Sequence, residues 1–244
     1  MSNMTEKSQD KNKTISSEST KENKPELSFT GKEKIGDAQL PKLPSPPPVR
    51  HKDFKHSTPK YSITIGGNAV DPPPYQRFNV FTAGSIEMGK AVKWQSLMAQ
   101  LLSDLPITVC DPRRPDRDWD PAMARVKDNN GLTGMRAQID WELDAQDQAD
   151  VICFFFDVDT NSPVSLLELG LFAKSKKVVV CCDARYHKWD NVQITCERYG
   201  IPHVETFAKL ELEVRSMLKK QGMVLDDKGD LIGPNVHKPK RKTH

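Results

Sequence analysis

The sequence lacks the features that mark secreted, membrane-spanning and zinc-binding proteins. It has no basic start followed by an apolar stretch, so we expect no secretory signal peptide. No apolar run approaches the ~20 residues that a membrane helix needs, so we expect no membrane partner. No pair of Cys or His residues has the spacing of a zinc site, and we expect neither a metal nor a cofactor.

Cysteine is scarce, and its count of five is odd. Four of the five lie in apolar runs that are typical of strands. Such a pattern indicates reduced thiols in the core of an intracellular protein rather than a disulfide framework. These four are Cys110, Cys153, Cys181 and Cys182.

The chain has no large excess of either charge, because 36 basic and 33 acidic residues leave a net charge of only +3. So small an excess does not indicate a strongly anionic partner, and we do not expect nucleic-acid binding. One basic cluster, KPKRK at Lys238 to Lys242, is either a nuclear address, a nucleic-acid contact or a solvated tail. The expected location is therefore intracellular, in the cytoplasm or the nucleus.

Large apolar residues are nearly missing from the two ends of the chain. Residues 1–58 are rich in Lys, Glu, Ser, Asn and Pro, and such a segment cannot bury enough surface to offset its ordering entropy. We expect it to be disordered, with a polyproline-like linker at Leu40 to Pro48. Residues 222–244 predict a flexible basic tail. Between them, residues 59–221 form a domain of roughly 165 residues, enough for one core.

Within this domain, apolar strands alternate five times with amphipathic helices. The alternation predicts a three-layer α/β fold of the flavodoxin-like or Rossmann-like type, with a five-stranded parallel sheet. Residues 61–70 predict an extra edge strand or an arm. The predicted strands cover 78–83, 106–110, 150–156, 177–182 and 203–205, and the predicted helices begin after Gly84, near Gly134, at Ser162, near Val192 and at Phe207.

Two loops of this fold are expected to face each other. If the strand order is 2-1-3-4-5, the loops after the first and third strands meet at the carboxyl edge of the sheet, where such folds bind ligands. These loops are GSIEMG, which starts at Gly84, and DVDTNSP, which starts at Asp157. Both are expected to run into helix N-termini, which favour anions. Ser162 has the residue type of an N-cap, and Pro163 that of a first helical position.

The first loop has a second interpretation. Gly84 to Lys90 reads GSIEMGK and fits the first seven positions of the phosphate-cradle pattern of P-loop-type NTPases. The strand ICFFFD, which ends in Asp157, is similar to the strand that helps hold magnesium in such enzymes. Against this, Ala91 has no hydroxyl for magnesium, and Glu87 places a negative charge inside a loop that would hold phosphates.

Several motifs together resemble the nucleoside 2-deoxyribosyltransferase-like family. They are FTAGSIEMG, PRR with WD nearby, QIDWEL and SPVSLLELG, and the resemblance covers roughly Phe78 to Tyr199. It implies a flavodoxin-like sheet, a homo-oligomer, and a small nucleoside or nucleotide as the ligand. It also implies cleavage of an N-glycosidic bond through a covalent glycosyl-Glu intermediate. The GSI turn is equally similar to the 2′-deoxynucleoside 5′-phosphate N-hydrolases, so transfer, hydrolysis and binding without turnover all stay open.

The resemblance makes Glu168, the acid of ELG, the nucleophile. A carboxylate suits attack on an anomeric carbon, and its place in an apolar helix needs a reason because desolvating it is costly. By the same resemblance, Glu142 holds or protonates the departing base, with an ordinary exposed helix glutamate as the alternative, and Asn191 completes the site of a neighbouring subunit. Ser162 stands where the transferases carry an acid that orients the nucleophile.

Four further residues are candidates for substrate binding. Gly84 permits close backbone approach, and Ser85 offers a hydroxyl for the sugar or a phosphate. Glu87 either offers its carboxylate to a sugar hydroxyl or is a plain carboxylate at a helix N-terminus, and Trp141 offers a ring for stacking on a base. For Trp141 a place in the core is the competing interpretation. Asp111, Arg113 and Arg114 either border the pocket or form a salt-bridged loop.

The helix around Glu168 is apolar on nearly every side. A helix on one face of a sheet normally keeps a polar side, so this composition favours a contact between subunits. The residues concerned are Val164, Leu166, Leu167, Leu169, Leu171 and Phe172.

Overall fold

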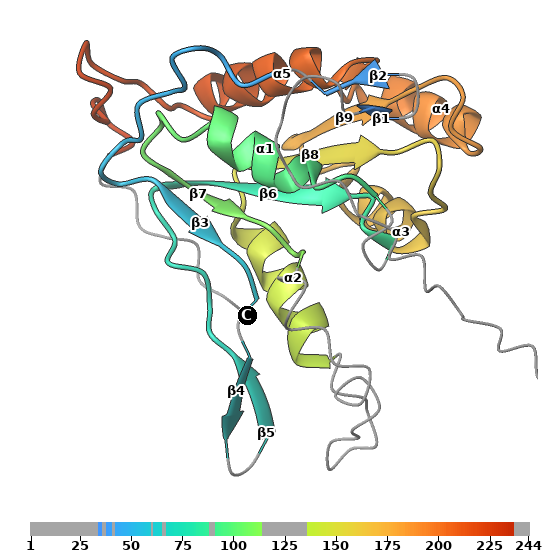
Figure 1. Cartoon of the computed structure of the whole chain (residues 1–244), viewed down its shortest axis with the longest axis horizontal. Helices are drawn as coiled ribbons and strands as arrows, with labels where there is room; N and C mark the ends of the chain where they lie inside the picture. The colour runs from blue at the N-terminus through green and yellow to red at the C-terminus, as the bar shows by residue number, and fades with distance from the viewer. Residues whose placement is uncertain are drawn as a thin grey trace, which may run out of the picture.

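The computed structural model describes residues 34–35, 38–40, 42–59, 61–64, 67–87, 91–113 and 136–236. Its centre is a sheet of six parallel strands in the order β10-β9-β8-β6-β7-β3 (Figure 1). Five of them are the predicted strands in the predicted order, which confirms the fold class. The strands are β3 (Lys55–Ser57), β6 (Phe78–Gly84), β7 (Ile107–Cys110), β8 (Val151–Phe156), β9 (Val178–Cys182) and β10 (His203–Val204).

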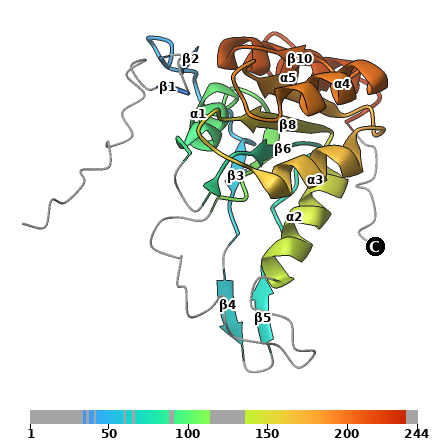
Figure 2. The same ribbon diagram turned by 90° about the vertical axis from the view of Figure 1, so that its right-hand side faces the viewer.

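Helices cover both faces of the sheet. One core contains buried side chains of α1 and α5, and the other contains those of α2, α3 and α4. Figure 2 shows α2 and α3 together on their side of the sheet, away from α1 and α5. The helices are α1 (Trp94–Leu101), α2 (Arg136–Gln148), α3 (Pro163–Phe172), α4 (Trp189–Tyr199) and α5 (Phe207–Lys220).

Strand β8 shows why an unbroken apolar run forms the middle of such a sheet. Its side chains alternate between the two cores, with Phe155 in the core of α1 and α5, and with Phe154 and Phe156 in the other. All six of its residues are buried. A strand that is covered on both faces needs apolar residues at every position, as the sequence predicts.

The N-terminal region differs from the prediction of disorder over residues 42–58. Strand β3 pairs with β7 and adds the sixth strand at the edge of the sheet. Leu40 and Phe54, at 1% and 4% exposure, lie in the core of α1 and α5. Composition averages over a whole segment and therefore misses two isolated apolar residues that fit into the core of an adjacent domain.

The C-terminal region differs from its prediction in the same way. Met223 is buried, and a β-bridge joins Leu225 to Leu231. The Asn235 side chain donates a hydrogen bond to Gly222 O, while Arg77 donates one to Asn235 O. The ordered chain therefore continues well beyond residue 221. The basic cluster KPKRK lies outside the described residues.

Residues 61–64 and 67–70 form an arm rather than an edge strand. β4 (Tyr61–Thr64) and β5 (Gly67–Val70) pair antiparallel in a sheet of their own, which projects from the rest of the chain (Figure 1). A second small sheet joins β1 (Lys34–Ile35) to β2 (Ala38–Gln39).

The structure describes the cysteines and the helices, which the sequence predicts to be reduced core residues and too short to span a membrane. All five cysteines are free and buried. Among the described residues, no helix is both long enough and apolar enough to cross a membrane.

Candidate functional site

The loops after β6 and β8 meet, as the predicted strand order requires. The Ser85 hydroxyl accepts a hydrogen bond of 2.8 Å from Asp157 N. It also lies 2.7 Å from Thr160 Oγ1 and 2.7 Å from Ser162 Oγ, and these two hydroxyls are 2.8 Å apart. We call Ser85, Thr160 and Ser162 the hydroxyl cluster. All three residues are buried, so the cluster ties the two loops together.

Gly84 lets β6 approach β8 closely. Its φ is +128°, and a Cβ there would lie 2.2 Å from Phe155 O. The next amide, Ser85 N, donates a hydrogen bond of 2.9 Å to the same oxygen. The predicted close approach at Gly84 is therefore to a neighbouring strand. The Ser85 hydroxyl, which the sequence offers to a ligand, has protein partners.

The helix predicted to begin after Gly84 is not seen over the described residues 91–93. α1 begins only at Trp94, and residues 88–90 lie outside the described chain. Ser85 O accepts hydrogen bonds from the Trp94 indole at 3.0 Å and from Gln95 Nε2 at 3.4 Å. A phosphate cradle needs its amides free for the ligand, whereas Ser85 N is bonded to the sheet. The described part of the pattern, residues 84–87, therefore gives the P-loop alternative no support.

The second loop does lead into a helix, because α3 begins at Pro163 as predicted. Ser162, however, makes no side-chain cap. It has a left-handed backbone with φ of 44°, and its hydroxyl belongs to the hydroxyl cluster.

Glu168 lies on the buried side of α3 and is 8% exposed. Its Oε1 accepts a hydrogen bond from Nε2 of Gln146 on α2. The pKa of Glu168 is raised to about 7, mainly by burial. The hydrogen bond from Gln146 lowers this pKa, and the negative charge of Glu142 raises it. Near neutral pH the group is therefore divided between carboxylate and carboxylic acid, which is suitable for a group that reacts.

Glu142, the second predicted carboxylate, lies on α2 one turn before Gln146. Its Oε1 accepts a hydrogen bond of 2.6 Å from Gln138 Nε2. Its charge raises the pKa of Glu168, and Gln146, the hydrogen-bond partner of Glu168, lies one turn later on the same helix. Gln138, Glu142 and Gln146 are spaced by four residues and so share one face of the helix. This spacing from Glu142 is the only sign in the sequence that the two glutamines lie beside that acid.

Trp141 is a core residue. It is 4% exposed, its ring lies 6.5 Å from that of Phe81, and its indole N–H donates to Asp71 O at 3.1 Å. These surroundings fit a tryptophan of the core better than one that stacks on the base of a ligand.

The remaining polar candidates near the loops are used within the protein. Glu87, with a positive φ of 41°, accepts a hydrogen bond from Asn161 N. Arg113 donates to Ala91 O and Val92 O, each at 3.0 Å. The carboxylate of Asp111 lies 3.2 Å from His56. Arg114 lies outside the described residues.

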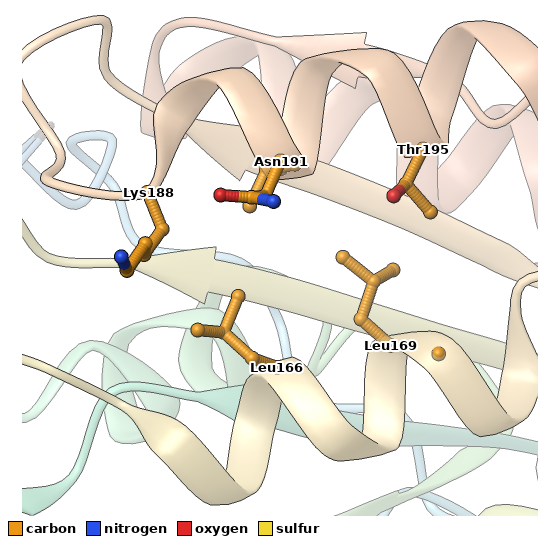
Figure 3. A pocket seen from close by; sticks show the side chains of 7 residues that line it. Leu166, Leu169, Lys188, Asn191 and Thr195 are labelled. Atoms are coloured by element: carbon orange, nitrogen blue, oxygen red, sulfur yellow. The ribbon is translucent and has the colours of Figure 1, made fainter.

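Asn191 is exposed on α4 and lines a groove of about 350 Å³ between α3 and α4. Figure 3 shows Leu166 and Leu169 of α3 facing Asn191 and Thr195 of α4, with Lys188 at one end. Glu168 does not line this groove. Within one chain, the structure therefore does not bring Asn191 and Glu168 together.

The model of the nucleoside 2-deoxyribosyltransferase like family matches residues 77–186. This segment is a nucleoside 2-deoxyribosyltransferase-like domain. It contains the hydroxyl cluster, Glu142, Gln146 and Glu168, and it ends before Asn191. No curated protein gave a match to the chain.

Proposed function

We propose that this nucleoside 2-deoxyribosyltransferase-like domain cleaves the N-glycosidic bond of deoxynucleosides or their monophosphates, with Glu168 as the nucleophile. The observation that carries the proposal is the pair of acids on facing helices. Glu168 is buried and held by Gln146, and the more accessible Glu142 acts on it. Two carboxylates in unlike surroundings can divide the roles of nucleophile and base-binding group.

The chemistry balances with Glu168 and solvent. A carboxylate oxygen of Glu168 forms a bond to the anomeric carbon, while the bond from that carbon to the base nitrogen breaks and its electron pair leaves with the base. Glu142, as a carboxylate, holds the base, and solvent supplies the proton that the departing base nitrogen takes up. Water or a second base then attacks the anomeric carbon and loses a proton to solvent, which releases Glu168 as a carboxylate.

Glu168 must be ionised to begin this cycle. With a pKa of about 7, a large share of the protein carries the reactive carboxylate at neutral pH. Burial makes that carboxylate poorly solvated, and the same burial favours its conversion into a neutral ester. Activity is therefore expected to fall as pH drops below 7.

Whether the acceptor is water or a base distinguishes a 2′-deoxynucleoside 5′-phosphate N-hydrolase from a transferase. A second candidate function, a nucleotide-binding sensor without turnover, is favoured by one observation. Ser162 stands where the transferases have an orienting acid, and its hydroxyl is bonded within the hydroxyl cluster. Turnover therefore requires another group to orient Glu168.

We also propose a homo-oligomer. The outer side of α3 exposes Val164, Leu167 and Leu171 at 60%, 64% and 59%, and Ile194 of α4 is 59% exposed. These four residues, which we call the α3–α4 patch, lie on the two helices that border the groove of Asn191. A second copy over this patch would remove apolar surface from water and bring further side chains to the site.

The full chain should be incubated with deoxyinosine and free adenine, and the products separated. Deoxyadenosine would indicate transfer, and hypoxanthine with free deoxyribose would indicate hydrolysis. Brief exposure to a 2-fluoro deoxynucleoside, followed by peptide mass spectrometry, should find the sugar on Glu168. Base release that survives in Glu168→Ala would remove the nucleophile from the proposal, and binding without release would support the sensor.

A further inference from the structure

Gln146 is buried completely and faces the candidate nucleophile from another helix. Its Nε2 donates to Glu168 Oε1, while its own Oε1 has no hydrogen-bond partner among the described residues. A buried amide oxygen without a hydrogen-bond partner lowers the stability of the fold, so its presence requires an explanation.

The backbone of Gln146 is fixed in place by a second contact. The ammonium of Lys177, the residue before β9, donates to Gln146 O at 2.7 Å and to Asp147 O at 3.1 Å. This contact holds the end of α2 against the sheet. The Gln146 amide is therefore presented to Glu168 from a rigid element, which is what accurate positioning of a reactive group requires.

We propose that Gln146 is the positioning residue for Glu168 and takes over the orienting role that Ser162 does not perform. The inference rests on the proposed function. Ser162 directs its hydroxyl to Ser85 and Thr160, whereas Gln146 bonds directly to the carboxyl group of Glu168.

A glutamine suits both protonation states of the acid. When Glu168 is a carboxylate, Nε2 donates to it, as the structure shows. When Glu168 is protonated, rotation of the amide by half a turn lets its oxygen accept the carboxyl proton instead. The unpartnered Oε1 is the atom that this second arrangement would use. Occupying one carboxylate oxygen also leaves the other for attack on the sugar.

The charges around Glu168 determine whether its pKa rises or falls when Gln146 is replaced. On α2, Glu142 favours the protonated form, as does burial, and Gln146 alone among the named causes favours the carboxylate. Just before β9, the Lys177 ammonium is bonded to backbone carbonyls of α2. Removing the Gln146 donor should therefore raise the pKa of Glu168 further.

The test compares Gln146→Met with Gln146→Asn and with the control Gln148→Met. Gln148 is a buried glutamine two residues later on the same helix. Gln146→Met keeps an unbranched side chain of similar length without donors. We expect it to lower kcat about 10- to 100-fold and to move the acid limb of the pH profile up by about one unit. Gln146→Asn should restore part of both, and Gln148→Met should change neither.

A second readout needs no substrate. The titration of Glu168 is followed by carbon-13 NMR of the full chain labelled at its Glu carboxyl carbons, with Glu168→Gln to assign the signal. A midpoint in Gln146→Met above that of the wild type supports the inference even if no turnover is found, in which case the proposed function fails alone. An unchanged midpoint, or an unchanged pH profile in an active protein, overturns the role of Gln146 and leaves the proposed function standing.

Discussion

The Ser85 hydroxyl lies 2.7 Å from the Ser162 hydroxyl, and this contact joins the loop after β6 to the loop after β8. Two residues 77 positions apart in sequence thus join the two loops at the edge where a flavodoxin-like sheet normally binds a ligand. The candidate nucleophile lies between α2 and α3, where Gln146 meets Glu168. The hydroxyl cluster supports this site by fixing the start of α3.

The hydroxyl cluster should be a measurable part of the stability of the domain. Ser85→Ala leaves Asp157 N buried without its acceptor, so we expect a loss of about 1–3 kcal/mol in the free energy of unfolding. Urea denaturation of the wild type and the variant measures it. Ser216→Ala, a half-buried serine on α5, is the matched control and should change stability by less than about 0.5 kcal/mol. Equal effects of the two substitutions would show that the cluster adds nothing.

Gly84 should tolerate no side chain at all. Alanine there combines a positive φ of 128° with a Cβ at 2.2 Å from Phe155 O, an atom of a central strand that cannot move away. We expect Gly84→Ala to cost more than about 3 kcal/mol or to prevent folding. Gly170→Ala is the control, because it lies in α3 with nothing within 4 Å of the added Cβ. Its thermal midpoint should stay unchanged or rise slightly, since alanine is the better helix former.

The fold is largely predictable from the sequence because it depends on local periodicity. Each run of apolar residues sets one strand or helix, and alternation of the two leaves few arrangements other than a parallel sheet. The burial of Leu40 and Phe54 is not local. Each is a single apolar residue in a polar segment, and only the finished core supplies the space that it fills. The sixth strand, β3, lies in the same polar segment, and the sequence did not predict it for the same reason.

The candidate site was predictable only in part, for a related reason. An acid in an apolar helix draws attention to Glu168 by itself. The residue that holds it is 22 positions earlier on another helix, and nothing in the spacing of Gln138, Glu142 and Gln146 says which helix they face. Ser162 was correctly placed before the helix, but its hydroxyl found partners in the other loop rather than on α3.

The pKa of Glu168 predicts an unusual dependence of stability on pH. The folded-state pKa is raised from 4.5 to about 7, so the folded protein binds the extra proton more tightly than the unfolded chain does. This contribution is fully present below pH 4.5 and is lost as pH rises through 7, with a total of roughly 3 kcal/mol. Glu168→Gln stays neutral and should be more stable than the wild type at pH 8, with the advantage disappearing near pH 4.5.

Guanidinium denaturation at pH 4.5, 6, 7 and 8 measures this difference. Glu205→Gln, an exposed acid before α5, serves as the control and should follow the wild type at every pH. A difference between Glu168→Gln and the wild type that does not vary with pH would mean that Glu168 titrates normally in the folded protein.

The α3–α4 patch predicts self-association that depends on its apolar residues. A charge at Leu167, which is 64% exposed, would have to be desolvated in any contact formed over α3, so Leu167→Glu should shift the protein to monomer. Sedimentation equilibrium over a range of concentrations measures the shift. Leu212→Glu is closely matched, because Leu212 is 63% exposed and lies on α5, against the other face of the sheet. If Leu212→Glu dissociates the oligomer and Leu167→Glu does not, the contact lies on the α5 side, and the groove of Asn191 stays open in the assembled protein.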